Sequence, residues 1–132
     1  MPGQTHYKSR VVENLGATAL VAADFVPSAG FGSTATATPV AGSSDSRGAV
    51  DILCQGSGIA ANPSVVLTFK DGTWKDSDGA DRIPFVVGCR GDTDANTGFW
   101  AVTTVTATAV TFTFVGTPVT AHTYRLDYLV KP

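Results

Sequence analysis

Two short runs of the chain carry oxygen-bearing side chains at alternate positions, as calcium-binding loops do. They are Asp76-Ser-Asp-Gly-Ala-Asp81 and Asp92-Thr-Asp-Ala-Asn-Thr-Gly98. A calcium ion needs several close oxygen ligands, which such spacing can supply. Neither run completes the pattern, because in the second the glycine comes one position late and Thr103 stands where a bidentate acid is required. Asp, Asn and Gly are also ordinary turn residues, so we interpret both runs as turns and predict neither a metal site nor a cofactor.

The side chains that a hydrolase would use do not form a recognisable set. A nucleophilic serine needs a base within hydrogen-bond reach and a third group that orients this base. The two histidines, His6 and His122, fall in unrelated segments, and Glu13 is the single glutamate. No spacing selects a catalytic pair among the aspartates. The sequence therefore predicts a protein that is not an enzyme.

Two features are similar to recognition motifs. Arg90-Gly-Asp92 has the letters of an integrin-binding tripeptide, but a turn that begins at Gly91 explains these residues without a partner. Trp74 lies in the longest loop, residues 71–82, beside charged neighbours. An exposed tryptophan there can stack on a sugar or anchor an interface, whereas the alternative is a ring folded back over the edge of the domain. Trp74 is therefore a possible ligand-binding residue.

The elements that must position these residues are β-strands. Residues 99–106, 110–115 and 123–130 are rich in β-branched and aromatic residues and are separated by turn residues. The last two alternate between apolar and polar positions, which predicts an antiparallel sheet packed on one side. The residues expected on its buried face are Val110, Phe112, Phe114, Tyr124, Leu126, Tyr128 and Val130.

Four further strands are expected at residues 34–40, 48–56, 64–70 and 84–89, each bounded by turn clusters. About seven short strands with no sustained helical pattern predict an all-β fold, an antiparallel β-sandwich of jelly-roll or immunoglobulin-like topology. The inward-facing residues expected from these strands are Val50, Ile52, Cys54, Val65, Leu67, Phe69, Phe85, Val87 and Cys89. Of Phe99 and Trp100, one must face outward, and we expect Phe99 to pack in the core.

Residues 1–32 differ from the rest of the chain. Their apolar residues fit neither a helical nor a strand period, and Gly16, Pro27, Gly30 and Gly32 interrupt them. We expect an extended N-terminal arm with one short strand or helical turn, followed by a sandwich domain at residues 33–132. Such an arm has few contacts within its own domain, so it can find them on a neighbour.

Composition limits the partners. A net charge of −2 with single, scattered basic residues gives no clustered basic face for nucleic acid. No apolar run approaches the ~20 residues that cross a bilayer, and the N-terminus lacks the apolar region of a signal peptide, so we expect synthesis in a cytoplasm. Cytoplasmic synthesis favours free thiols packed as small hydrophobes at Cys54 and Cys89, with a disulfide as the alternative. Charged residues are only 15% of the chain, and such surfaces suit contact with other proteins.

Several segments resemble small β-sandwich virion proteins of tailed bacteriophages, a group that includes capsid decoration (cement) proteins, head fibres and tail-fibre tip domains. The segments are 7–16 (Tyr-Lys-Ser-Arg-Val-Val-Glu-Asn-Leu-Gly), 62–74 (Asn-Pro-Ser-Val-Val-Leu-Thr-Phe-Lys-Asp-Gly-Thr-Trp), 84–87 (Pro-Phe-Val-Val), 116–119 (Gly-Thr-Pro-Val) and 123–130 (Thr-Tyr-Arg-Leu-Asp-Tyr-Leu-Val). The resemblance is best from about residue 48 to the end. It rests on strands and turns and not on a catalytic motif.

The resemblance implies a structural protein that binds the major capsid protein on the outside of a phage capsid and stabilises the shell. Decoration proteins of this kind are usually trimers that clamp adjacent capsomers, often through a terminal arm. A short chain without a stalk repeat favours a decoration protein over a fibre tip. The capsid-binding residues expected in the arm are Tyr7, Arg10, Val11, Val12 and Leu15. The alternative is a fibre-tip, receptor-binding or carbohydrate-binding module that uses Trp74.

Overall fold

The computed structural model describes residues 16–92 and 98–132, and this part of the chain is a β-sandwich. Two short 3-10 helices, η2 (Ala22–Asp24) and η3 (Ala29–Phe31), flank the first strand. The strands are β1 (Phe25–Pro27), β2 (Thr36–Pro39), β3 (Arg47–Leu53), β4 (Ser64–Thr68), β5 (Phe85–Arg90), β6 (Phe99–Val105), β7 (Ala109–Val115) and β8 (Thr123–Lys131). The predicted all-β class is confirmed.

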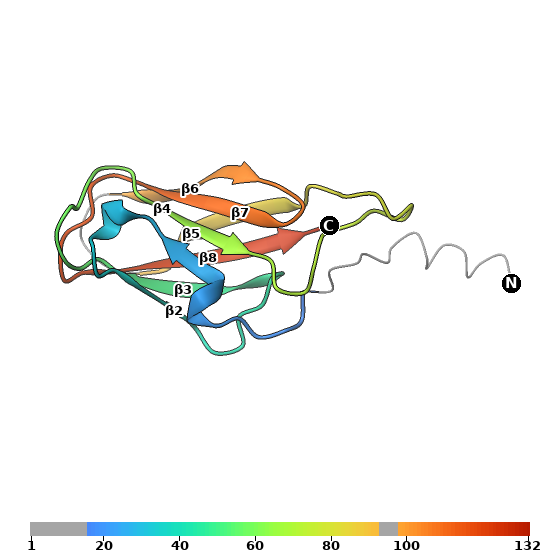
Figure 1. Ribbon diagram of the computed structural model, residues 1–132, viewed down its shortest axis with the longest axis horizontal. Helices are drawn as coiled ribbons and strands as arrows, with labels where there is room; N and C mark the ends of the chain where they lie inside the picture. Colours follow the sequence, from blue (N-terminus) through green and yellow to red (C-terminus); the bar gives the residue numbers. More distant parts are fainter. Residues whose placement is uncertain (1–15, 93–97) are drawn as a thin grey trace, which may run out of the picture.

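The strands form two antiparallel sheets that pack face to face (Figure 1). One sheet has the order β1-β4-β7-β6 and the other the order β2-β3-β8-β5. Hairpins join β2 to β3 and β6 to β7, whereas the other connections between successive strands cross from one sheet to the other. Each sheet therefore depends on strands that are distant in sequence, such as β3 and β8, which pair along the whole length of β3.

The core lies between β7 and β8, as their alternation predicts. Phe112 and Phe114 on β7 and Tyr124 and Leu126 on β8 are fully buried. The rings of Phe114 and Tyr124 pack with centroids 4.7 Å apart, which joins the two sheets near one end of the sandwich. Burying a side chain of this size contributes about 1.5–3 kcal/mol, so these two strands supply much of the stabilising apolar burial.

Residues 20–31 belong to the sandwich and not to an arm. Leu20, Phe25 and Phe31 are buried in the core, and β1 pairs with β4. The sandwich therefore begins nearer the N-terminus than residue 33. The apolar residues of this segment follow no single repeat, because β1 is three residues long and lies between two single-turn helices.

Strand β5 faces the opposite way from our prediction. Phe85, Val87 and Cys89 point outward, and Phe85 is 66% exposed. The reason is at Gly88, which faces the core: a Cβ atom there would lie 2.9 Å from the ring of Phe112. A Cβ atom fits at this position only if the Phe112 ring shifts, so the close packing of Gly88 against the opposite sheet favours the burial of this side of the strand.

The prediction for the start of β6 was also wrong. Trp100 is buried and Phe99 is 58% exposed. The indole of Trp100 packs against the rings of Phe31 and Phe114, and its Nε1 donates a hydrogen bond to the backbone oxygen of Arg125 at 3.2 Å. Phenylalanine has no donor for that carbonyl, so tryptophan suits the inward position better.

The two cysteines are free thiols in different environments. Cys54 is buried in the core, and this burial raises the pKa of its thiol. Cys89 is exposed on the outer face of β5, which corrects the expectation that both thiols are packed as core residues. Across residues 16–92 and 98–132, no helix has the length and apolar character that a membrane span requires.

Candidate interaction surface

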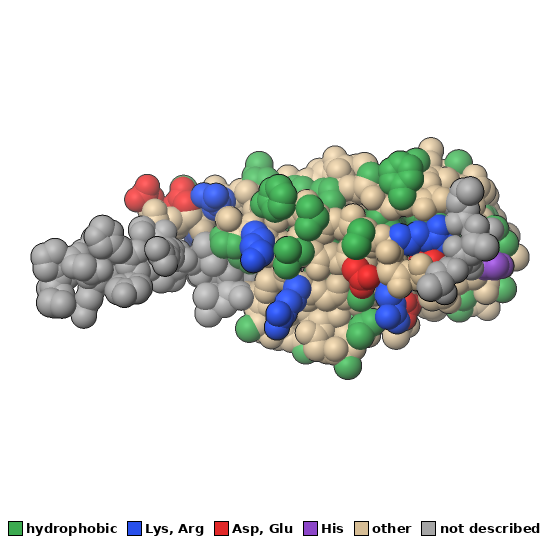
Figure 2. Space-filling model, turned by 180° about the vertical axis from the view of Figure 1, so that it is seen from behind, with side chains coloured by type: hydrophobic (Ala, Val, Ile, Leu, Met, Phe, Trp, Pro, Cys, Tyr) green, Lys and Arg blue, Asp and Glu red, His purple; other side chains and the backbone are tan. Residues whose placement is uncertain are grey.

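The outer face of the β2-β3-β8-β5 sheet is more apolar at one end of its strands than at the other. Across the sheet, Arg47, Leu129 and Val87 are aligned in one row. The next row contains Ala49, Asp127 and Cys89. Hydrophobic side chains also lie among single basic and acidic groups on the face drawn in Figure 2. The outer face of this sheet thus combines apolar groups with single charged groups.

Several exposed apolar side chains lie together at the β5 edge of this sheet. Phe85, Val87 and Leu129 are exposed, and Val87 and Leu129 are direct cross-strand partners. Ile83, just before the strand, is also exposed. A shallow hollow of about 240 Å³ lies here, lined by Val87, Gly88, Cys89, Asp127, Tyr128 and Leu129. We call Ile83, Phe85, Val87, Cys89 and Leu129 the apolar edge.

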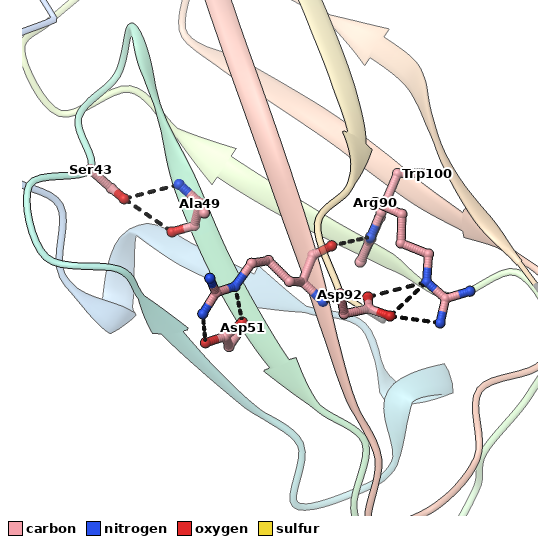
Figure 3. A network of polar contacts seen from close by, with 7 residues as sticks. Ser43, Ala49, Asp51, Arg90, Asp92 and Trp100 are labelled. Atoms are coloured by element: carbon pink, nitrogen blue, oxygen red, sulfur yellow. Dashed lines mark hydrogen bonds and ion pairs between the residues drawn. The ribbon is translucent and has the colours of Figure 1, made fainter. Parts of the chain in front are cut away.

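The opposite end of the face is polar and rigidly paired. Arg125 on β8 donates two hydrogen bonds to the carboxylate of Asp51 on β3, at 2.7 and 2.9 Å (Figure 3). The hydrogen bonds and charge of Asp51 raise the pKa of Arg125. A bidentate pair of this kind fixes the direction of both side chains. This end therefore offers little apolar area to a partner.

The last residue of β5 is turned inward and held by a network at the end of the sandwich (Figure 3). The Nε atom of Arg90 donates to Asp92 at 2.9 Å, and its guanidinium lies over the rings of Phe114 and Tyr124. Asp92 also accepts a hydrogen bond from the backbone N–H of Arg125 at 2.9 Å. Arg90 and Asp92 thus bind each other and the adjacent strand, which supports the interpretation of Arg90-Gly-Asp92 as a turn.

Trp74 does not lie in the position that a sugar-stacking residue needs. It is 2% exposed and packs edge-on against Phe69, with ring centroids 5.9 Å apart. Its backbone N–H donates to Ala107 and its carbonyl accepts from Arg82. The ring is therefore folded over the end of the sandwich, the second of the two interpretations weighed from the sequence. Its Nε1 has no hydrogen-bond partner among the described residues.

The first aspartate-rich run is a closed turn. The carboxylate of Asp76 accepts the backbone N–H groups of Asp78 and Ala80 at 2.9 and 3.0 Å. Its oxygen therefore serves the turn itself, as aspartate often does. Within residues 16–92 and 98–132, no group of three or more potential metal ligands comes together. Most of the second run, residues 93–97, lies outside the described residues.

The proposed capsid-binding residues Tyr7, Arg10, Val11, Val12 and Leu15 lie outside the described residues. The first described residues are fixed to the sandwich. Ser46 donates a hydrogen bond to the carbonyl of Gly16 at 2.7 Å, and the carboxylate of Asp71 accepts the backbone N–H groups of Ala17 and Thr18. Whatever residues 1–15 bind, their attachment point on the domain is well defined.

The contacts with residues 17 and 18 lower the pKa of Asp71. A hydrogen bond from the Thr18 side chain, together with those from backbone N–H groups, holds the pKa of the Asp71 carboxyl below its ordinary value. These bonds favour the charged form of the carboxyl. The ionised form of Asp71 therefore binds Ala17 and Thr18 more strongly than the neutral form does.

Sequence reasoning missed the apolar edge because it assigned Phe85, Val87 and Cys89 to the core. The signal that was available is Gly88, since a glycine inside a strand often marks a close approach of another residue. Had Gly88 been placed inward, its neighbours would have been placed outward. Comparison with protein-family models, curated proteins and solved structures found no match for this chain.

Proposed function

We propose that this chain is a structural, non-enzymatic protein that binds the outer surface of a phage capsid and stabilises the shell. The observation that carries the proposal is the apolar edge, where exposed Phe85, Val87 and Leu129 form a weakly charged surface suited to another protein. The likeness of several segments to phage decoration proteins supports the choice of the capsid as that partner.

The mechanism is mass action. A protein that binds only the assembled lattice lowers the free energy of that lattice relative to its free subunits. A rigid sandwich suits this task, because little ordering cost is added when its surface binds. The chain needs no titratable group or cofactor for this function.

The arm residues Tyr7, Arg10, Val11, Val12 and Leu15 are proposed as the second contact with the major capsid protein. They combine apolar and basic side chains in a segment just before Gly16, which is hydrogen-bonded to Ser46. The hydrogen bonds at residues 16–18 would transmit mechanical force between the arm and the sandwich. The arm and the apolar edge are separate parts of the chain, so their contributions can be measured separately.

The test is co-sedimentation with undecorated capsids. The full chain, a chain lacking residues 1–15, and the full-length variants Val11→Asp and Val26→Asp are compared at increasing concentration. Val26 is the matched control, because it is an exposed valine on β1 and is not one of the arm residues. We expect saturable binding that deletion and Val11→Asp weaken and Val26→Asp preserves. Absence of saturable binding by the full chain would refute the proposal.

A parallel sedimentation with host cells tests the receptor-binding or carbohydrate-binding alternative. The burial of Trp74 gives that alternative no aromatic platform at this residue. We therefore expect no binding to cells that depends on Trp74. Binding to cells without binding to capsids would move the chain to the adhesin class.

A further inference from the structure

Four strands form the open edges of the two sheets, and three of them carry features that hinder pairing with another strand. β1 and β2 are short and end in Pro27 and Pro39. β6 has a register shift between Val102 and Thr104. Short strands, prolines and bulges are the usual protection of sheet edges. β5 is six residues long and has no bulge, and its neighbouring proline, Pro84, stands before its first residue.

The residues of β5 alternate between those whose backbone groups bond to β8 and those whose backbone groups face the open edge. Gly91 N–H donates to the carbonyl of Arg125 at 3.0 Å, just beyond the end of the strand. Hydrogen-bonded pairs alternate along an antiparallel ladder, so Val87 and Cys89 also bond to β8. The N–H and C=O groups of Val86 and Gly88 therefore point away from β8.

The side chains along this edge are compatible with close approach of another strand. From Ile83 to Cys89 the chain carries no charge. Phe85, Val87 and Cys89 project on the outer face, where they are exposed. Charged side chains on an edge normally discourage pairing, and the one charged side chain of β5, Arg90, is turned inward and bound to Asp92.

We propose that β5 pairs antiparallel with β5 of a second copy of this chain, across a two-fold axis at Val87. In this register Val86 faces Gly88 of the second copy, so the backbone groups at the open edge satisfy each other. Val87 faces its own equivalent, and Phe85 faces Cys89 of the second copy. A two-fold interface is self-complementary, which this alternation of residues around Val87 provides.

Charge favours the antiparallel arrangement over a parallel one. Arg82 precedes the uncharged segment and Asp92 follows it. In-register parallel pairing would place Arg82 beside Arg82 of the second copy, which antiparallel pairing avoids. The carboxylate of Asp92 stays bound to Arg90 and to the backbone N–H of Arg125 of its own chain.

The pairing would join two β2-β3-β8-β5 sheets into one continuous sheet. It would also bring the two apolar edges together, with Leu129 and Val87 of each copy aligned in one row. The resulting unit is a dimer, not the trimer that the resemblance implies. The inference does not rest on the proposed function, since a dimer in solution requires no capsid.

The first experiment is sedimentation equilibrium of the full chain under reducing conditions, which prevents a disulfide at the exposed Cys89. We expect a reversible equilibrium between the 13.6 kDa chain and twice that mass. Val87→Lys places two ammonium groups opposite each other and should raise the dissociation constant at least about tenfold. Val26→Lys is the matched control, since Val26 is 59% exposed on the edge strand β1, and should leave the equilibrium unchanged.

A second experiment distinguishes edge pairing from any other dimer. Amide hydrogen exchange should show slow exchange at Val86 and Gly88 in the dimer and fast exchange at both in Val87→Lys. The amides of Val87 and Cys89, which bond to β8, should stay protected in both proteins. A chain that remains monomeric up to millimolar concentration, a trimer, or a dimer in which Val86 and Gly88 exchange freely would overturn the inference.

Discussion

At the scale of single residues, glycine decides the orientation of β5. Gly88 faces the core because ring carbons of Phe112 and the side chain of Leu126 occupy the space that a Cβ would need. This packing turns Phe85 and Val87 outward and creates the apolar edge. A residue without a side chain thus determines which side chains are available to a partner.

Gly88→Ala tests this role of Gly88. The new Cβ would lie 2.9 Å from the Phe112 ring, so we expect a loss of about 1–3 kcal/mol in the free energy of unfolding through overpacking. Urea denaturation measures the change. Val87→Ala on the exposed side of the strand serves as the control and should change stability far less. Equal stability of Gly88→Ala and wild type would mean that Gly88 does not face the core.

Asp71 makes the attachment of residues 16–18 sensitive to pH. Its folded pKa is lowered, so its contribution is complete above the unfolded pKa of about 4 and is lost as the pH falls through the folded pKa. We expect the protection factors of the Ala17 and Thr18 amides to fall as the pH falls through the folded pKa, and to be lower at neutral pH in Asp71→Asn than in the wild type. Asp76→Asn, in a separate turn, should leave both amides protected. Unchanged exchange in Asp71→Asn would contradict the role assigned to its carboxylate.

At the scale of elements, alternation predicted the strands that have one clear apolar face. In β7 and β8 every second residue is large and apolar, and those residues are buried. In β5 the sequence Phe-Val-Val-Gly-Cys-Arg places more apolar groups on the side that proves to be exposed. The burial of that strand depends on the opposite sheet, which a local pattern does not contain. β1 was missed because three residues are too few for a period.

The contrast between β7 and β5 predicts two phenylalanine variants with different effects. Phe114 is fully buried, so Phe114→Ala should lower the free energy of unfolding by about 3–5 kcal/mol. Phe85→Ala removes the same side chain from an exposed position and should cost much less. Chemical denaturation of both variants below the concentration of any self-association measures the difference. A large loss for Phe85→Ala would show that this side chain is buried after all.

At the scale of the whole molecule, a sandwich presents an outer face that combines apolar and charged groups, and an edge strand, β5, that has no partner strand on its outer side. The polar network at the end of β5 and the Asp51–Arg125 pair hold this face in shape. The fold class followed from strand and turn patterns, whereas the location of the contact surface required the packing of β5. The arm residues proposed from the sequence stay a prediction, since they precede the described part of the chain.

The measurement that tests the central claim most directly is the thermal disassembly of undecorated capsids with and without the purified chain. Because binding to the lattice alone stabilises it, the disassembly temperature should rise with chain concentration and reach a plateau when the sites are filled. The chain lacking residues 1–15 should give a smaller rise. A disassembly temperature that does not change at any concentration of the full chain would contradict the proposed stabilising function.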